Sequence, residues 1–307
     1  MTSAIQPLHA QAQDAAAPHE FQARIAALWV FPIKSCAGIS LPQAVLTPTG
    51  LTWDRAWMVV DAAGDMLTQR ELPRMALIQP ELSDAELLLY ASGMAAFAVP
   101  LSLPLPPRAA TTPVRVWEDE VPAFDMGPAA GAWLTQCLGD SHGHLRLVRF
   151  DERHPRLASP KWTQGAQALN QFSDGFPLLV ASTASLDELN TRLSQQGVAA
   201  VDMRRFRANL VLSQVQAHDE DRVGLMTIAT DTGAVQLNPV KPCSRCPIPN
   251  IDPDTGVSTP AVSDTLQVYR QDGRLNGAIT FGMNALPLAG IGHTLRVGQA
   301  VSAPWSF

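Results

Sequence analysis

The sequence of 307 residues contains little cysteine and little charge. It has four cysteines, Cys36, Cys137, Cys243 and Cys246, which are too few for a disulfide-rich scaffold. Only 16% of the residues are charged, and 28 acidic against 22 basic residues give a formal net charge of −6. General nucleic-acid binding requires a basic face that neutralises phosphates. We therefore expect no nucleic-acid partner.

Long apolar runs and dinucleotide motifs are also missing. No run approaches the ~18 apolar residues of a membrane span, and no G-x-G-x-x-G motif occurs. Residues 1–21 are rich in Ala and Gln and have neither the basic region nor the apolar region of a signal peptide. The sequence predicts a flexible tail over residues 1–21, no membrane association and a cytoplasmic location.

The first half of the chain reads as short strands separated by turns. Apolar segments at 25–31 and 56–60 end at turn residues, and segments 86–90 and 94–99 flank Ser92-Gly93 as in a hairpin. Prolines at 100, 104, 106, 107 and 113 exclude a central strand between them. We predict a small β-barrel or sandwich over residues 22–125.

Helices enter in the second half, residues 126–307. Ala130, Trp133, Leu134 and Cys137 share one helical face, which predicts a buried Cys137. The run beginning at Ser185 has the pattern of a capping box that opens a helix. Segments 206–213 and 227–237 read as strands, and 294–301 as a closing strand pair. The prediction is an α+β fold that is mostly β, with its second domain built on a barrel with a few helices.

The most informative stretch is 241–256, which holds a C-x-x-C pair. Arg245 lies between Cys243 and Cys246, and prolines on both sides stiffen the loop. The thiolate is the reactive and metal-binding form of cysteine, and a neighbouring cation favours it. This loop is the predicted site of the chemistry.

Three interpretations of this pair remain open. A structural zinc site needs two further ligands, and His293 is isolated. A thioredoxin-like dithiol needs a helix after the pair, which Pro247 and Pro249 disfavour. A single thiolate that ligates a soft-metal cofactor, with Arg245 beside an anionic group, needs no further ligands.

Basic residues elsewhere favour the third interpretation. Lys34 and Ser35 end a strand, Arg55 precedes another, and Arg207 lies just before Asn209. Arginine suits phosphate and carbonyl-rich heterocycles. The alternative for each cation is a solvated surface charge, and Cys36 beside Ser35 is expected to be a packed thiol rather than a ligand.

These motifs, taken in order, resemble those of the MOSC proteins. The resemblance runs from about residue 26 to 301 and is strongest for members with an N-terminal MOSC β-barrel, such as the mitochondrial amidoxime-reducing components and their bacterial relatives. The motifs that carry it are residues 32–36, 54–55, 206–209, 243–246 with 252–256, and 281–284.

The resemblance implies a molybdenum cofactor, in which a pterin dithiolene carries the metal. It implies that Cys246 ligates molybdenum and is the catalytic residue. The residues that it implies as contacts of the pterin and its phosphate are Lys34, Ser35, Arg55, Asp174, Arg207, Asn209, Ser244 and Arg245, together with Asn284, where relatives have an asparagine or an aromatic residue.

The implied activity is reduction of N-hydroxylated compounds, namely hydroxylamines, amidoximes and N-hydroxylated bases. Electrons would come from an external donor protein that is ferredoxin-like, flavodoxin-like or of cytochrome type. The family-level description also carries the term pyridoxal phosphate binding. Residues 247–250, Pro-Ile-Pro-Asn, depart from the aliphatic and threonine residues of the best-known reductases, which puts the substrate range in question.

Two other classes of function remain as alternatives. One is a sulfur carrier or cofactor-handling protein without turnover of its own. The other is a zinc-stabilised binding module with no chemistry.

Overall fold

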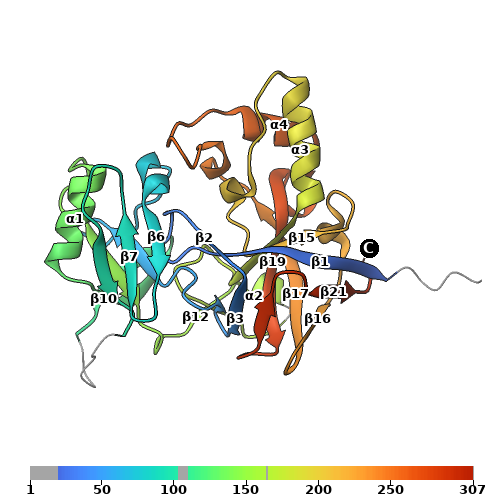
Figure 1. Ribbon diagram of the computed structural model, residues 1–307, viewed down its shortest axis with the longest axis horizontal. Helices are drawn as coiled ribbons and strands as arrows, with labels where there is room; N and C mark the ends of the chain where they lie inside the picture. Colours follow the sequence, from blue (N-terminus) through green and yellow to red (C-terminus); the bar gives the residue numbers. More distant parts are fainter. Residues whose placement is uncertain (1–19, 103–109, 164, 307) are drawn as a thin grey trace, which may run out of the picture.

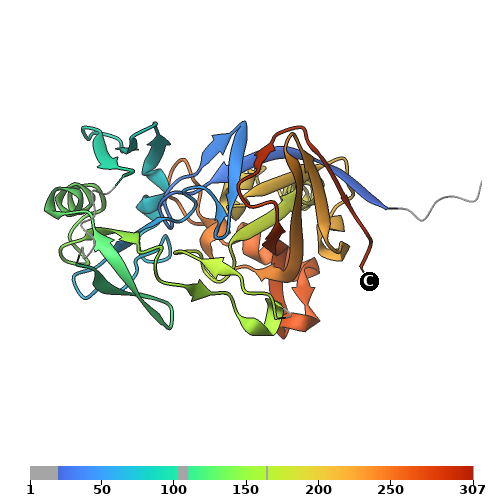
Figure 2. The same cartoon turned by 90° about the horizontal axis from the view of Figure 1, so that it is seen from below.

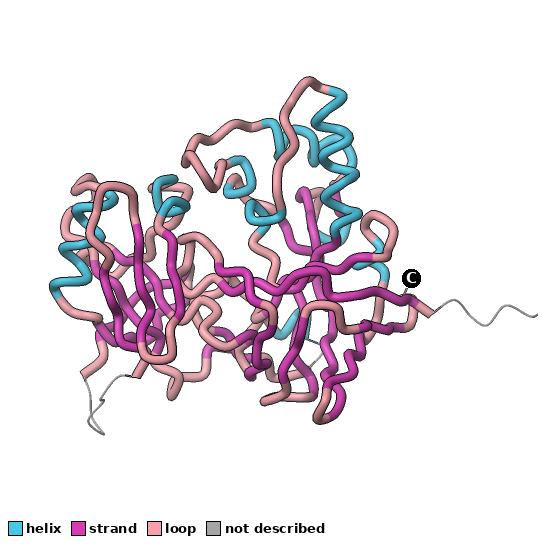
Figure 3. Tube along the Cα trace, in the orientation of Figure 1, coloured by secondary structure: helices cyan, strands magenta, loops and turns pink. Residues whose placement is uncertain are grey.

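The structure is a computed structural model that describes residues 20–102, 110–163 and 165–306. Residues 1–19 of the expected tail lie outside the described residues, as do Pro104, Pro106 and Pro107. Two β-rich halves lie side by side along the long axis of the molecule (Figures 1 and 2). Strands dominate both halves, and the helices lie mainly toward their outer sides (Figure 3).

The larger half is built on a closed ring of seven strands. Their order is β14, β15, β1, β21, β16, β17 and β19, and β19 pairs with β14 to close the ring. Only β14 and β15 run parallel among these pairs. The bounds are β1 Phe21–Val30, β14 Leu178–Ser182, β15 Leu210–Ser213, β16 Met226–Thr230, β17 Gly233–Ser244, β19 Ala278–Ala289 and β21 Ala300–Ala303.

The pattern of β1 shows why these residues form a barrel. Phe21, Ala23 and Ile25 are buried, whereas Gln22 and Arg24 between them are exposed. Successive side chains of a strand point to opposite faces, so an alternating sequence buries one face. The inward side chains of the ring form one apolar core. The prediction of a mostly β fold with a barrel in its second half is confirmed.

Helices α3 (Thr183–Gln195) and α4 (Ala261–Tyr269) pack on one side of the barrel (Figure 1). The expected start of α3 at Ser185 is wrong by one turn. Ser182 is the N-cap, and its Oγ accepts a hydrogen bond from the backbone N–H of Ser185. Ser182 is the N-cap because β14 ends there and its backbone is extended, as an N-cap requires.

The smaller half contains two sheets and α1 (Pro128–Leu138). One sheet has the order β5, β11, β10, β9, with bounds Trp57–Val60, Arg146–Phe150, Asp119–Asp125 and Thr112–Val116. The other is the meander β6 (Gln79–Leu82), β7 (Glu86–Tyr90) and β8 (Phe97–Pro100), which contains the predicted hairpin. Pro113 lies in the edge strand β9, where a missing N–H is tolerated.

The apolar face of α1 packs against these sheets. Ala130, Trp133, Leu134 and Cys137 are buried there, so the prediction of a buried Cys137 is confirmed, and Cys36 is buried in the same core. Strand β1 pairs within the barrel although it precedes the smaller half in sequence. The domain boundary expected at residue 125 remains a prediction. Strands on its two sides pair with each other, since β1 pairs with β15 and β21.

Short elements complete the fold. The remaining strands are β2 Ile39–Leu41, β3 Gln43–Thr47, β4 Gly50–Leu51, β12 Arg156–Leu157, β13 Leu169–Asn170, β18 Gln271–Asp272 and β20 Thr294–Arg296, and the remaining helix is α2 Pro160–Thr163. The 3-10 helices are η1 Pro73–Leu77, η2 Met203–Phe206, η3 Asp219–Arg222, η4 Ile248–Asn250 and η5 Gly273–Leu275. The closing strand pair predicted over 294–301 is wrong, because β20 pairs with β3 and β21 pairs with β1 and β16. Among the described helices, none has the length and apolarity needed to cross a membrane.

The strand expected over 206–213 begins only at Leu210. Phe206 ends η2, and Arg207 has left-handed backbone with φ of 59°. A left-handed residue cannot continue a strand, so Arg207 turns the chain before β15 begins. This turn brings Arg207 to the site described next.

Candidate functional site

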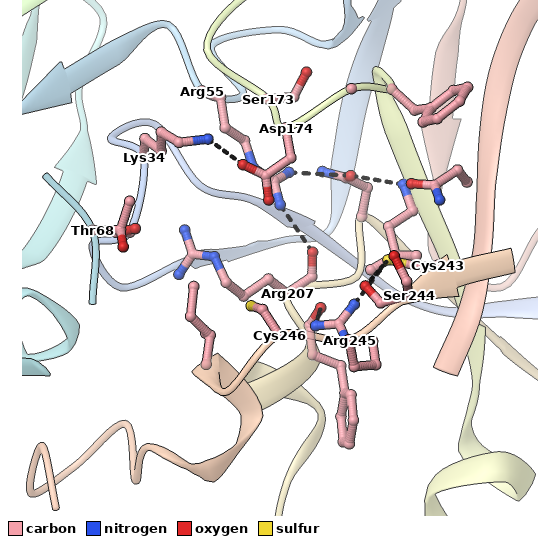
Figure 4. A pocket seen from close by; sticks show the side chains of 18 of the residues that line it. Lys34, Arg55, Thr68, Ser173, Asp174, Arg207, Cys243, Ser244, Arg245 and Cys246 are labelled. Carbon is pink, nitrogen blue, oxygen red and sulfur yellow. Dashed lines mark hydrogen bonds and ion pairs between the residues drawn. The ribbon is translucent and has the colours of Figure 1, made fainter. Parts of the chain in front are cut away.

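A cavity of about 120 Å³ lies where the two halves meet, and all ten residues that the sequence analysis singled out line it. They come from the loop after β1, the turns before β5 and β14, the turn after η2, the end of β17, and β19. The ten are Lys34, Ser35, Arg55, Asp174, Arg207, Asn209, Ser244, Arg245, Cys246 and Asn284. Figure 4 shows several of them pointing toward one another.

Four lining residues have left-handed backbone although none is glycine. The φ angles are 67° at Ser35, 51° at Arg55, 55° at Trp117 and 59° at Arg207. Such a conformation costs about 1–2 kcal/mol for a residue with a Cβ. It persists where the surrounding structure over-determines it, which is typical of functional sites.

Hydrogen bonds fix the guanidinium of Arg55. It donates to Oδ2 of Asp54, to Oδ1 of Asn209 at 3.2 Å and to the carbonyl of Arg207 at 3.0 Å. The guanidiniums of Arg55 and Arg207 both lie over the ring of Phe31, at 4.6 and 4.3 Å from its centroid. Two cations thus contact one aromatic ring, which partly offsets their mutual repulsion.

Lys34 and Asp174 form an ion pair in the cavity wall. Lys34 Nζ also donates to the carbonyl of Phe172 at 2.8 Å, and Nε1 of Trp117 donates to Oδ1 of Asp174 at 3.1 Å. Burial lowers the pKa of Lys34, and Asp174 partly opposes this shift. Desolvation raises the pKa of Asp174, but the charge and hydrogen bond of Lys34 outweigh it and hold that pKa well below its usual range. The carboxylate of Asp174 thus favours the ammonium form of Lys34.

Arg207 has a buried hydrogen-bond donor without an acceptor among the described residues. Burial and the nearby charge of Arg55 lower its pKa to about 9. Its Nη1 donates to the carbonyl of Cys36 at 2.6 Å, but its Nη2 is buried and has no hydrogen-bond partner among the described residues. The Nε atoms of Arg70 and Arg245, which line the same cavity, are also buried without a hydrogen-bond partner among the described residues.

Unpaired buried donors on cations are costly, because the charge has left water without compensation. An anion in this cavity would supply the missing acceptor. The concentration of cations is the more telling because the chain as a whole is acidic.

The C-x-x-C pair lies at the end of β17, and Figure 4 shows Cys246 beside Arg207 and Arg245. Arg245 donates from Nη1 to Sγ of Cys243 at 3.1 Å and from Nη2 to the carbonyl of Phe206 at 3.1 Å. The thiol of Cys246 is free and half-buried. Arg245 therefore holds the thiol of Cys243 in a hydrogen bond, and the thiol of Cys246 remains available to a ligand in the cavity.

Ion pairs anchor the segment that follows the cysteines to η2. Arg205 pairs with Asp252 at 2.8 Å, and Arg204 pairs with Asp254 at 2.7 Å and with Asp202 at 2.5 Å. These contacts hold the Asp-Pro-Asp-Thr-Gly turn, residues 252–256, against the residues that precede Arg207. The turn motif thus fixes the position of Cys246 relative to Arg207 rather than lining the cavity itself.

Further residues of the cavity carried no signal in the sequence. Arg70 lies 4.5 Å from the ring centroid of Trp117, and Thr68 and Ser173 line the wall beside them. Each is a single polar or aromatic residue in a loop, without a motif around it. Only the packing of the two halves brings them to the site.

The geometry bears on the zinc alternative. Among the described residues, no three His, Cys, Asp or Glu side chains gather to hold a metal ion. A structural zinc site with four protein ligands is thus not assembled around Cys243 and Cys246 in the part of the chain that the structure describes.

Two family models match the chain. Residues 22–141 match the MOSC N-terminal beta barrel domain, and residues 168–302 match the MOSC domain. The chain belongs to the MOSC family.

The chain is also similar to characterised members. It is 35% identical to mitochondrial amidoxime-reducing component 1 of Mus musculus, over 90% of this chain and 81% of the relative, and 35% identical to the Homo sapiens protein of that name, over 80% and 72%. It is 33% identical to molybdenum cofactor sulfurase of Danio rerio over 83% of this chain, which corresponds to 31% of that longer protein. Neither these names nor the family descriptions mention pyridoxal phosphate, so that term is not carried to this chain.

Proposed function

We propose that this chain is a molybdenum-cofactor-dependent reductase of N-hydroxylated compounds that receives electrons from an external donor protein. The observation that carries the proposal is the meeting of three unpaired guanidinium N–H groups and a free thiol, that of Cys246, in one cavity. A pterin phosphate would satisfy the donors, and a thiolate is a preferred ligand of soft metals.

The residues present fit such a cofactor. Lys34, Arg55, Arg207 and Arg245 would neutralise the phosphate and bind the pterin, with Ser35, Asp174, Asn209, Ser244 and Asn284 as polar contacts. Cys246 would ligate the metal. Asn284 is already oriented by a hydrogen bond from its Nδ2 to the carbonyl of Lys241 at 3.2 Å.

The net reaction for a hydroxylamine is RNHOH + 2e⁻ + 2H⁺ → RNH₂ + H₂O. When bound, the cofactor supplies a redox-active metal at which the N–O bond is reduced. The chain supplies the fixed thiolate, the cations that hold the anionic cofactor, and buried walls that limit access of water. Asp174 keeps the Lys34 ammonium in place within this wall.

Electrons must reach the site from outside the chain. The four cysteines cannot form a four-cysteine iron–sulfur site, because Cys36 and Cys137 are buried apart from the C-x-x-C pair. We therefore propose a ferredoxin-like, flavodoxin-like or cytochrome-type donor. The names of the amidoxime-reducing relatives support the substrate class.

The decisive experiment supplies the cofactor-loaded protein with reduced viologen and a panel of hydroxylamines and amidoximes. We expect product amine or amidine from the wild type and none above background from Cys246→Ser. No reduction by either protein would overturn the proposal. Transferable sulfur on a cysteine would then favour a cofactor-handling role, which the similarity to a cofactor sulfurase also supports.

A further inference from the structure

A second cavity, of about 350 Å³, lies beside the first and is built from both halves of the molecule. The barrel contributes Trp29 and Phe31, which are stacked with ring centroids 6.4 Å apart and planes at 20°. The smaller half contributes Gln69, Ala76 and Pro80. Its volume is in the range of small-molecule pockets, which begins at about 300 Å³.

The two cavities share walls at the reactive end. Arg207 and Ile248 line both, and Ile248 is two residues after Cys246. A molecule in the second cavity would thus have one end close to the thiol of Cys246. The guanidinium of Arg207 therefore lies at the junction of the two cavities.

The walls of the second cavity suit an uncharged, flat body. Arg204 and Arg205 line it, but their charges are already paired with aspartates. Apart from Arg207 at the junction and the hydroxyl of Ser40, the remaining surface is aromatic, aliphatic or amide. Away from that junction, a charged body would lose its hydration without gaining a free partner of opposite charge, whereas an aromatic ring would pack on such walls.

Small residues keep the cavity open. Ala37, Gly38 and Ala76 line it. A Cβ on Gly38 would come within 2.4 Å of Cε1 of Phe31, so any side chain there would displace that ring. The backbone N–H of Ala37 donates to the carbonyl of Ile78 at 3.0 Å, which fixes this loop of the barrel half against the smaller half.

We infer that this second cavity binds the body of the substrate, and that it selects N-hydroxylated compounds with an uncharged aromatic group. The inference rests on the proposed reductase function. The N–OH group would point to the junction at Arg207 and Cys246, and the ring would lie against Trp29 and Phe31.

The first test compares a substrate with an aromatic body, benzamidoxime, with one that has no body, hydroxylamine. The cofactor-loaded protein is supplied with reduced viologen. Ala37→Leu adds three carbons to the half-buried lining. We expect its KM for benzamidoxime to rise about tenfold more than its KM for hydroxylamine, since one misplaced methylene in a pocket already costs about tenfold or more.

Two further variants keep this test interpretable. Gln79→Trp narrows the same cavity from an exposed position in β6, so it does not threaten folding, and it should raise the same KM ratio. Ala91→Leu is the matched control. It places the same side chain at another half-buried alanine that lines neither cavity, and it should leave the ratio of the two KM values unchanged.

The second test does not depend on turnover. Benzamide has the same flat body but no N–O bond, and its binding is followed by ligand-observed NMR titration. We expect wild-type protein to bind it and Ala37→Leu to weaken binding about tenfold. Binding without turnover of any substrate would overturn the reductase function but not the assignment of the cavity. Benzamide binding or KM ratios equal in Ala37→Leu, Gln79→Trp and the wild type would overturn the assignment.

Discussion

Individual residues of the site hold conformations and charges that folding alone does not favour. Arg207 is left-handed, half-buried and close to the cation of Arg55, and its buried Nη2 has no partner among the described residues. Ser35 and Arg55 are left-handed as well. Native proteins keep such costs where a ligand or a function repays them. Cys246 is the complementary case, because its thiol is left free while that of Cys243 is bonded to Arg245.

The two cysteines should therefore differ in their effect on metal content. We expect about one molybdenum per chain in protein made in a host that synthesises the cofactor, a loss of most of it in Cys246→Ser, and retention in Cys243→Ser. Elemental analysis of the purified proteins measures this. Stoichiometric zinc without molybdenum, or equal losses in both variants, would contradict the assignment of Cys246.

His218 should make stability depend on pH. Burial, then the cation of Arg270, lowers its pKa to about 4, and Oε2 of Glu188, at 3.5 Å from Nε2, only partly opposes this. The unfolded chain binds a proton at an ordinary pKa near 6.5, so the folded state loses stability as the pH falls from about 6.5 to about 4. The full effect is roughly 3 kcal/mol.

His218→Asn should flatten this dependence. Asparagine tolerates the left-handed backbone at this position, where φ is 64°. Urea unfolding at pH 7 and pH 4.5 gives the comparison. A wild-type protein whose stability does not change more than that of the variant over this interval would refute the role of His218.

At the scale of elements, ion pairs connect the segment after the cysteines to η2. Arg205 is the more enclosed member, with a side chain that is 11% exposed. The pairs lie outside the first cavity, yet they hold the loop that presents Cys246 near Arg207. Precise placement of a ligand by supporting contacts of this kind is a general requirement of metal sites.

Loss of this connection should affect both stability and cofactor. We expect Arg205→Met to lower the free energy of unfolding by about 1–2 kcal/mol and to reduce molybdenum retention. Arg274→Met removes the ion pair between the exposed Arg274 in η5 and Asp272 in β18, and it should change stability by less than ~1 kcal/mol and molybdenum retention not at all. Urea unfolding and elemental analysis test both variants, and equal behaviour of the two would show that the Arg205 pair has no positioning role.

At the scale of the whole molecule, the cavity belongs to neither half alone. Lys34, Arg55 and Arg70 come from segments that precede β14, and Arg207 and Arg245 come from the segments after it. A bound anion would connect them across the junction. Cofactor binding should therefore stabilise the fold as a unit.

We expect the cofactor-loaded protein to unfold at a temperature at least about 5 °C above that of protein made in a host without cofactor synthesis. A ligand at a hundred times its Kd contributes about 2.7 kcal/mol, and 1 kcal/mol shifts Tm by about 2–4 °C in domains of this size. Arg207→Asn, which keeps left-handed backbone accessible, should shrink the difference. Calorimetry measures the Tm of each protein. Identical Tm values with and without the cofactor would exclude this coupling.

Local patterns in the sequence were sufficient for some of these features. An apolar run that ends at a turn predicted a strand over 25–31, which overlaps β1, and two runs around Ser92-Gly93 predicted the hairpin of β7 and β8. The apolar face of α1 predicted a buried Cys137. Competing local signals failed where tertiary context decided, as at the start of α3, which Ser182 caps instead of Ser185. The strand expected from Phe206 was displaced because Arg207 turns the chain.

The sequence by itself determined which chemical groups are available: one free C-x-x-C pair, a few cations in an acidic chain, and the ordered motifs of the MOSC family. These follow from residue identity and short spacing. Only the tertiary structure decided that the groups meet, that Arg70 and Trp117 join them, and that a second cavity adjoins the first. The reason is physical, since closure of the barrel and its packing against the smaller half depend on contacts between residues far apart in the chain, which no local pattern specifies.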